Sequence, residues 1–285
     1  MIRQHSIART TILNMKIQFY CPRWGSENTN WDDFCQKVKL AGYDGVETPA
    51  PEDPNEQNIM TKALEKNNLL LIGQYYQSFE KDFDEHKANY IKHLYLLSSF
   101  KPLKINAQTG KDYFSFEQNL ALFAVADAIA KETGIPIGHE THRGKALFAS
   151  HIAHQFLKEL PDLRITADFS HWCNVAESLL EDQQEALAVA CKRVGHIHSR
   201  VGSSQSAQVI DPRLPEFKTE LEAHLNWWDE IIKDYQNKKI DKITITTEFG
   251  PAPYMVHLPF TKMPVANQWD INLYMMHLLK ERYGK

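Results

Sequence analysis

The sequence predicts an α/β fold, a (β/α)8 TIM barrel in a single domain, and three observations support this prediction. Short apolar segments alternate about eight times with longer amphipathic segments, without a long structureless gap. The chain has 285 residues, which is near the usual size of one such barrel. Polar and acidic residues recur where the apolar segments end, and the strand ends of a closed parallel barrel converge on one mouth. We therefore expect the functional site at that mouth.

The expected strands are short, mostly apolar runs that end at polar or turn-forming residues. Each is followed by a segment long enough to return the chain to the next parallel strand. The eight runs are Lys16–Tyr20, Gly45–Glu47, Leu69–Gln74, Leu103–Asn106, Ile135–His139, Ile165–Asp168, Val194–His198 and Ile243–Glu248.

The expected helices have apolar residues at helical spacing and end at residues that favour termination. Trp31–Ala41 stops at Gly42, and Phe116–Thr133 stops at Gly134. Three further helices follow the same logic and are expected at Phe148–Leu160, Ala176–Cys191 and Asn226–Gln236.

An open, doubly wound sheet would also alternate strands with helices. No G-x-G-x-x-G motif follows the first expected strand, and this favours the barrel over the dinucleotide-binding form of the open sheet. No linker, low-complexity tract or repeat divides residues 15–285, which we expect to form the barrel. Residues 1–14 are expected to be a poorly ordered N-terminal extension, because Met15 directly precedes the first strand.

Composition limits the partners of the protein. The formal net charge is −4 and no basic run is visible, which argues against nucleic-acid binding. No stretch approaches the roughly 18 apolar residues of a membrane span. The four cysteines are widely scattered without a C-x-x-C spacing, so we expect reduced thiols in a cytoplasmic protein. We therefore expect a substrate that is small or neutral, or whose charge is bound by a few local residues.

Two apolar segments leave the oligomeric state open. Trp227, Trp228 and the segment Trp269–Leu279 carry many apolar side chains. They could form the face of a homo-oligomer, or they could cover the wall of the barrel.

Residues of types that bind metals stand at the ends of the expected fifth to eighth strands: Glu140, Asp168, His198 and Glu248. Three carboxylates that converge without a cation would repel one another and raise one another's pKa values. Such a set with one imidazole suits one divalent ion, Mn, Mg, Co or Zn. Two alternatives stay open. Asp168 could cap the following helix. His196 lies on the same strand face as His198 and competes with it, although His196 could also be a hydrogen-bonded histidine of the core.

These segments resemble the xylose isomerase-like TIM barrels, a superfamily of sugar and sugar-phosphate isomerases and epimerases that also includes the AP endonucleases. Ala167-Asp-Phe-Ser-His171 matches the family's Asp-x-x-His, and Gly42-Tyr-Asp-Gly-Val-Glu47 resembles the segment that begins its second strand. The resemblance implies that the Glu–Asp–His–Glu set binds one divalent metal. It also implies that Glu140 and Glu248 are catalytic and move a proton on opposite faces of a substrate carbon.

The sequence departs from the nuclease branch of this superfamily. Endonuclease IV carries three zinc ions and needs histidines at the ends of its second and third strands. Here those ends read Val-Glu-Thr-Pro and Ile-Gly-Gln-Tyr, without histidine. A second departure concerns the ketose 3-epimerases, which place a substrate-binding arginine several residues past the metal-ligating histidine. Here Arg200 comes only two residues after His198.

Several further residues are expected to bind substrate. The resemblance implies that His171 contacts it, and Arg143, His142 and Arg200 are candidates for binding an anionic group. Polar side chains that could bind hydroxyl groups are Glu47, Gln74, Asn106 and Gln108. Salt bridges at the rim or hydrogen bonds within loops would explain each of these residues without a substrate.

The function implied by the resemblance is a metal-dependent isomerase or epimerase that acts on a small sugar, sugar phosphate or related polyol ketone through an enediolate. One alternative is a metal-dependent dehydratase of the inosose type, which shares the enediolate step. The other is a barrel that binds a carbohydrate without converting it. An intact ligand set favours an enzyme over such a binding protein.

Overall fold

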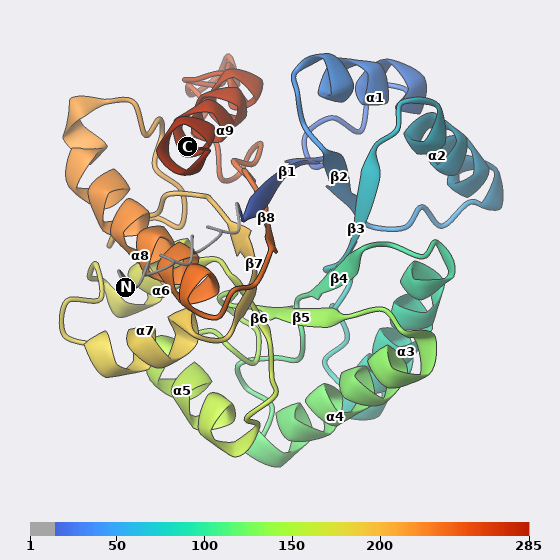
Figure 1. Cartoon of the computed structure of the whole chain (residues 1–285), viewed down its shortest axis with the longest axis vertical. Coiled ribbons are helices and arrows are strands. Elements are labelled where there is room, and N and C mark those ends of the chain that lie inside the picture. Colours follow the sequence, from blue (N-terminus) through green and yellow to red (C-terminus); the bar gives the residue numbers. More distant parts are fainter. Residues whose placement is uncertain (1–14, 285) are drawn as a thin grey trace, which may run out of the picture.

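The computed structural model describes residues 15–284, and these form a closed eight-stranded parallel barrel ringed by helices (Figure 1). This confirms the predicted (β/α)8 fold. The N-terminal extension expected at residues 1–14 lies outside the described residues. The strands are β1 (Lys16–Pro22), β2 (Gly45–Thr48), β3 (Leu70–Tyr75), β4 (Lys104–Ala107), β5 (Ile137–Glu140), β6 (Ile165–Ala167), β7 (Val194–His198) and β8 (Lys242–Thr246).

The barrel closes because β1 pairs with β8 as well as with β2. In this register Tyr20 lies opposite Gly45. A Cβ atom at Gly45 would come within 2.3 Å of the Leu70 carbonyl oxygen and 2.5 Å of the Tyr20 ring, so only glycine fits between these strands.

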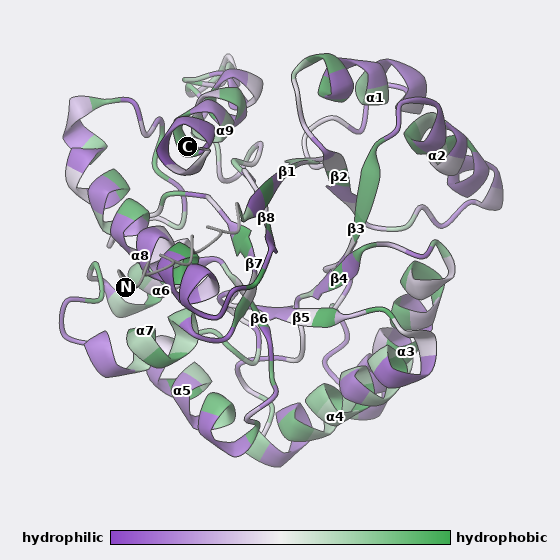
Figure 2. Cartoon of the chain, viewed as in Figure 1, coloured by the Kyte–Doolittle hydropathy of each residue, from purple (hydrophilic) through white to green (hydrophobic). Residues whose placement is uncertain are grey.

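Helices form the outer layer. Their bounds are α1 (Trp31–Leu40), α2 (Pro54–Lys66), α3 (Phe83–Ser99), α4 (Phe116–Thr133), α5 (Ser150–Glu159), α6 (Phe169–Ala176), α7 (Gln184–Cys191), the 3-10 turn η1 (Pro215–Phe217), α8 (Lys218–Asn237) and α9 (Gln268–Tyr283). Figure 2 shows hydrophilic and hydrophobic residues mixed along these helices, as expected of helices with one face on a barrel.

Local sequence explains where α4 begins and ends. Ser115 accepts a hydrogen bond from the backbone N–H of Gln118, and the Gln118 side chain accepts one from the backbone N–H of Ser115. Gly134 ends the helix with a φ of 73°, a left-handed conformation that glycine adopts without strain. The observed bounds of this helix equal the predicted ones.

The helix expected at Ala176–Cys191 was wrong. Ala176 is the last residue of α6, and α7 begins only at Gln184. Glu177 and Leu180 between them take positive φ values of 50° and 62°, which interrupt a right-handed helix although neither residue is glycine.

The two apolar segments that could form either an oligomer face or a cover for the barrel pack against the protein's own core. Trp227 and Trp228 of α8 are buried in the core cluster, together with Ile271, Met275 and Leu279 of α9. They cover the barrel wall, which is the second of the two roles considered for them. The four cysteines are free and buried, and no helix among the described residues is long and apolar enough to span a membrane.

Candidate metal centre and substrate cavity

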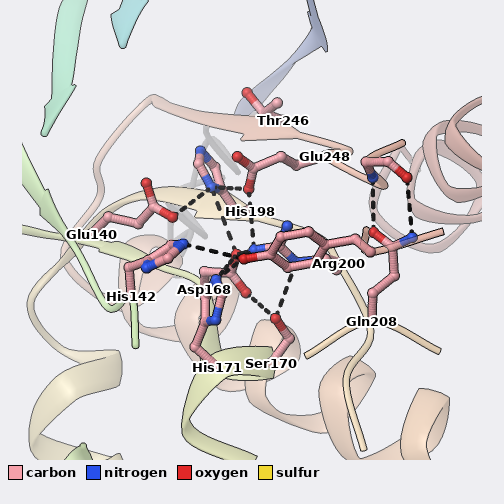
Figure 3. A network of polar contacts seen from close by, with 12 residues as sticks. Glu140, His142, Asp168, Ser170, His171, His198, Arg200, Gln208, Thr246 and Glu248 are labelled. Carbon is pink, nitrogen blue, oxygen red and sulfur yellow. Dashed lines mark hydrogen bonds and ion pairs between the residues drawn. The ribbon is translucent and has the colours of Figure 1, made fainter. Parts of the chain in front are cut away.

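Four predicted ligands meet where β5, β6, β7 and β8 end (Figure 3). Glu140 and His198 are the last residues of their strands, Asp168 follows β6 directly, and Glu248 comes two residues after β8. Each offers one ligand atom, and these four atoms lie within 4.8 Å of one another. All four residues are at most 3% exposed. The structure thus brings the predicted set together around one point.

The Nδ1 atom of His198 is central to this cluster. It lies 3.8 Å from Glu140 Oε1 and 3.9 Å from Asp168 Oδ2, and it is in direct contact with Glu248 Oε2. Neither His198 Nδ1 nor Glu248 Oε2 has a hydrogen-bond partner among residues 15–284. Buried polar atoms without partners are rare, and here they share one small space with two further carboxylates.

Crowding of buried charges shifts the pKa values of the residues in this cluster. Burial, and after it the charge of Glu248, raises the pKa of Glu140 to about 8. Burial also raises the pKa of Asp168, although Arg200 opposes this. Burial alone would lower the pKa of His198, yet the charges of Glu248, Glu47 and Glu140 hold it well above its usual value. A divalent cation fits such a donor set of three carboxylates and one imidazole.

Glu47 lies on the other side of the His198 ring. Its two carboxylate oxygens are 3.1 Å and 3.2 Å from His198 Nε2, and one is 3.0 Å from His196 Nε2. Asn106 donates to Glu47 at 3.0 Å and to Glu140 at 2.9 Å. Burial would raise the pKa of Glu47, but the charges of His198 and His196 hold it well below its usual range. Glu47 and Asn106 therefore support the cluster of four candidate ligands from within the barrel.

Asp168 does not cap α6 with its side chain, which excludes one alternative for this residue. Its carboxylate instead accepts hydrogen bonds from Arg200 and Ser170. Arg200 also donates from Nε to Ser170 at 3.2 Å and lies 2.7 Å from His171 Nε2 through Nη2. His171 in turn packs against His142, with ring centroids 3.8 Å apart and the ring planes tilted by 46°. These contacts orient Asp168 and largely occupy Arg200.

Glu248 sits in a strained backbone. Its φ is 52°, in the left-handed region that residues other than glycine seldom adopt. The next two residues are clamped by amide side chains: Asn272 of α9 bonds both the N–H and the C=O of Phe249 at 2.9 Å, and Gln208 bonds both groups of Gly250 at 2.8 Å and 3.2 Å. These four hydrogen bonds hold the chain directly after Glu248, and Figure 3 shows the two that Gln208 makes.

A cavity of about 400 Å³ opens above the cluster, and Glu140 and Glu248 form part of its lining. Four of the residues expected to bind substrate also line it: Gln74, Gln108, His142 and Arg200. The other lining residues are Arg23, Trp24, Glu27, Pro49, Tyr76 and Tyr254.

The remaining expected substrate residues lie outside the lining of this cavity. Glu47 and Asn106 are buried beneath the cluster, and His171 is buried behind His142. Arg143 is exposed, where it donates to Asn174 at 3.0 Å and lies over the Tyr254 ring at 5.0 Å.

No protein-family model and no curated protein matches this sequence. Among solved structures, a xylose isomerase domain-containing protein from Salmonella typhimurium matches with a TM-score of 0.62 at 14% identity, over 95% of this chain and 99% of the other. The chain has the xylose isomerase-like TIM-barrel fold.

Two further structures of this fold type have named activities. The 3-keto-D-glucoside 4-epimerase of E. coli matches with a TM-score of 0.60 at 13% identity, over 93% of this chain and 100% of the other. A probable 3-DHS dehydratase of Bacillus anthracis matches with a TM-score of 0.57 at 17% identity, over 94% and 100% of the two chains. At these identities the likeness establishes the fold of this xylose isomerase-like barrel and not its reaction.

Two kinds of residue in this xylose isomerase-like barrel were not predicted from the sequence. Arg23 lines the cavity, and a charged residue directly after the first strand was the available signal. Gln208 and Asn272 clamp the Glu248 loop, but they lie far along the chain from it and no local pattern marks them. Three aromatic residues, Trp24, Tyr76 and Tyr254, also line the cavity.

Proposed function

We propose that the protein is a divalent-metal-dependent isomerase or epimerase of a small sugar, sugar phosphate or related polyol ketone. The observation that carries the proposal is the buried cluster of Glu140, Asp168, His198 and Glu248 at a cavity of about 400 Å³. A cavity of that size accommodates one small molecule. One solved structure with this fold is that of an epimerase, which agrees with this choice.

All four residues would hold the metal. When bound, one divalent ion supplies a Lewis acid that polarises a carbonyl and stabilises developing enediolate charge. Asp168 and His198 stay behind the cavity lining, whereas Glu140 and Glu248 form part of it. The two glutamates are therefore the members of the set that can also reach a substrate carbon.

Glu140 and Glu248 are each oriented by a glutamine from a neighbouring part of the mouth. Gln74 of β3 donates to Glu248 Oε1 at 3.3 Å, and Gln108 donates to Glu140 Oε1 at 3.5 Å. Paired carboxylates fixed in this way can remove a proton beside a carbonyl and return one to the same carbon. One glutamate acts as the base while the other acts as the acid, and inversion results when they face opposite sides of the carbon.

Aromatic side chains would keep water away from the enediolate. Trp24 and Tyr254 pack edge to face with ring centroids 5.2 Å apart, and both line the cavity. A Cβ atom at Gly250 would lie 2.1 Å from the Trp24 ring, so this glycine lets the indole approach the Glu248 loop. Exclusion of water protects a reactive intermediate from side reactions.

A dehydratase is the second candidate, because a structure of the same fold is that of a probable dehydratase. It would use the same proton removal and then expel a hydroxyl group as water. A barrel that binds a carbohydrate without turnover is the third candidate, and two cavity-facing glutamates in one metal-binding set favour an enzyme over it.

The test is exchange of substrate hydrogen with solvent deuterium. We expect the manganese-loaded protein to exchange one C–H of a ketose, ketose phosphate or inosose in D2O, followed by NMR. Glu140→Gln and Glu248→Gln should each slow the exchange by about 10²–10⁴-fold. Product analysis separates an epimer from a dehydrated product. Exchange that survives chelation of all metal, or an unimpaired Glu248→Gln variant, would contradict the proposal.

A further inference from the structure

Arg23 is a buried cation on the wall of the candidate cavity. It directly follows β1, it is 6% exposed, and it lines the same cavity as Glu140 and Glu248.

The guanidinium group is held rigidly. Its central carbon lies 4.5 Å from the ring centroid of Trp31 and 4.5 Å from that of Phe34, both on α1. Its Nη2 atom donates to the carbonyl oxygens of Thr29 and Glu27. Arginine suits such a place because its planar group stacks on aromatic rings while its N–H groups remain directed in the plane.

The charge of Arg23 is left without a partner in this arrangement. Its Nη1 atom is buried and makes no hydrogen bond to any residue in the range 15–284. Within the same range no carboxylate oxygen lies close enough to form an ion pair with it. Burial lowers the pKa of Arg23, and the charge of Glu27 is the largest that opposes this, with a smaller contribution from Glu56. The Glu27 carboxylate accepts the Gly25 backbone N–H at 3.0 Å and forms no ion pair with Arg23.

Arg200, the other arginine of the cavity, contrasts with Arg23. It pairs with Asp168 and also contacts Ser170 and His171, so its charge is compensated inside the protein. A buried charge without a counterion is unfavourable, and arginine does not lose its proton in proteins. The counterion of Arg23 is therefore to be sought in what enters the cavity.

We infer that Arg23 binds an anionic group of the substrate, a carboxylate or a phosphate monoester, on the β1 side of the cavity. This inference rests on the proposed function, since it assigns the charge of the molecule whose ketose end meets Glu140 and Glu248. Arg23 is then a specificity-determining residue, and neutral sugars of the same carbon skeleton are poor ligands. A solely structural Arg23, which ties the loop between β1 and α1, would produce no such preference.

The test compares three ketoses that differ only at C6: D-fructose, D-fructuronate and D-fructose 6-phosphate. Their affinities are measured by calorimetry with manganese-loaded and with metal-free protein, and malonate and inorganic phosphate serve as simple anionic probes. We expect at least one anionic ketose to bind about tenfold or more tightly than fructose. Fructuronate and fructose 6-phosphate distinguish a carboxylate site from a phosphate site.

Arg23→Gln should reduce this preference to about threefold or less. Arg23→Lys keeps the charge but loses the planar group, so we expect an intermediate preference. The matched control is Arg164→Gln, because Arg164 is exposed and precedes β6 at the opposite end of the barrel. Thermal melts show which variants are folded. If Arg23→Gln does not fold, the test relies on Arg23→Lys. A reduced preference for the anionic ketose in this variant supports the inference, and a full preference contradicts it.

Two outcomes would overturn the inference. One is a wild-type protein that binds neither anionic ketose nor either simple anion in preference to fructose. The other is a folded Arg23 variant that retains the full preference. Because the preference is a ratio measured with and without metal, it can survive in a protein that binds no metal, and failure of the proposed function is thereby distinguished from failure of this inference.

Discussion

Glu47 and His198 form a buried carboxylate–imidazole pair, in which Nε2 of His198 lies 3.1 Å from one carboxylate oxygen and 3.2 Å from the other. The opposite ring nitrogen, Nδ1, faces the three other members of the candidate metal centre. A carboxylate behind a metal-ligating histidine fixes the tautomer and the ring orientation, and it raises the basicity of the ligand. Glu47 was expected to bind substrate, whereas its position suits a residue that orients His198.

Glu47→Gln should therefore weaken metal binding. Loss of the carboxylate charge leaves His198 less basic, and such changes typically lower metal affinity by about 10–100-fold. Calorimetric titration with Mn2+ measures this directly. Glu65→Gln, on an exposed face of α2, is the matched control and should bind like the wild type. An unchanged metal affinity together with a raised KM would instead favour the substrate-binding role of Glu47.

Asn272→Ala should lower both stability and metal affinity. The change removes two hydrogen bonds to the Phe249 backbone, and a buried N–H group left without a partner costs about 1–3 kcal/mol. Because Phe249 directly follows Glu248, we also expect weaker binding of Mn2+. Urea denaturation and calorimetry check the two effects, with Asn237→Ala at the exposed end of α8 as the control. Lower stability with unchanged metal affinity would show that Asn272 does not position Glu248.

Acid should destabilise the protein through His224. Its Nε2 accepts the Gly202 N–H at 3.2 Å, and its Nδ1 donates to the Glu220 carbonyl at 2.8 Å, so the neutral ring is required. Burial lowers the pKa of His224 from 6.5 to about 4. The unfolded chain then binds the proton more readily, and the free energy of unfolding falls as the pH drops from about 6.5 toward about 4. The shift corresponds to at most about 3 kcal/mol.

The measurement is urea denaturation between pH 7 and pH 4.5 for the wild type and for His224→Gln. Carboxyl groups with raised pKa values, such as Glu140, contribute to this range with the opposite sign. The comparison therefore uses the difference between the two proteins at each pH. We expect the variant to be less stable at pH 7 and to show a smaller loss toward pH 4.5. Parallel curves for the two proteins would refute the assignment to His224.

The strands and the four clustered ligands could be predicted because their signals are local. A short stretch of sequence is enough to recognise an apolar run that ends in an acid or a histidine. Any closed parallel barrel brings the ends of its strands together, independent of the exact register. The roles of Glu47 and Arg23 depend instead on register and depth. Glu47 lies beside Pro22 across the β1–β2 pairing and turns into the barrel, a position that spacing along one strand does not reveal.

The prediction of one continuous helix was wrong for a related reason. The segment Ala176–Cys191 has apolar residues at helical spacing, yet Glu177 and Leu180 adopt left-handed conformations. Tertiary packing outweighs the weak local preference for helix at these two positions, since Leu180 is fully buried in the core. The clamps from Gln208 and Asn272 to the Glu248 loop are likewise tertiary contacts between distant segments.

Metal binding by the purified protein tests the central claim most directly. Titration with Mn2+, Co2+, Zn2+ and Mg2+, together with elemental analysis, should give about one bound ion per chain for at least one of these metals. Glu248→Gln and Asp168→Asn should weaken that binding by at least about tenfold, with Glu65→Gln as the unaffected control. Absence of binding by the folded wild type, or binding that both variants retain unchanged, would contradict a metal centre at Glu140, Asp168, His198 and Glu248.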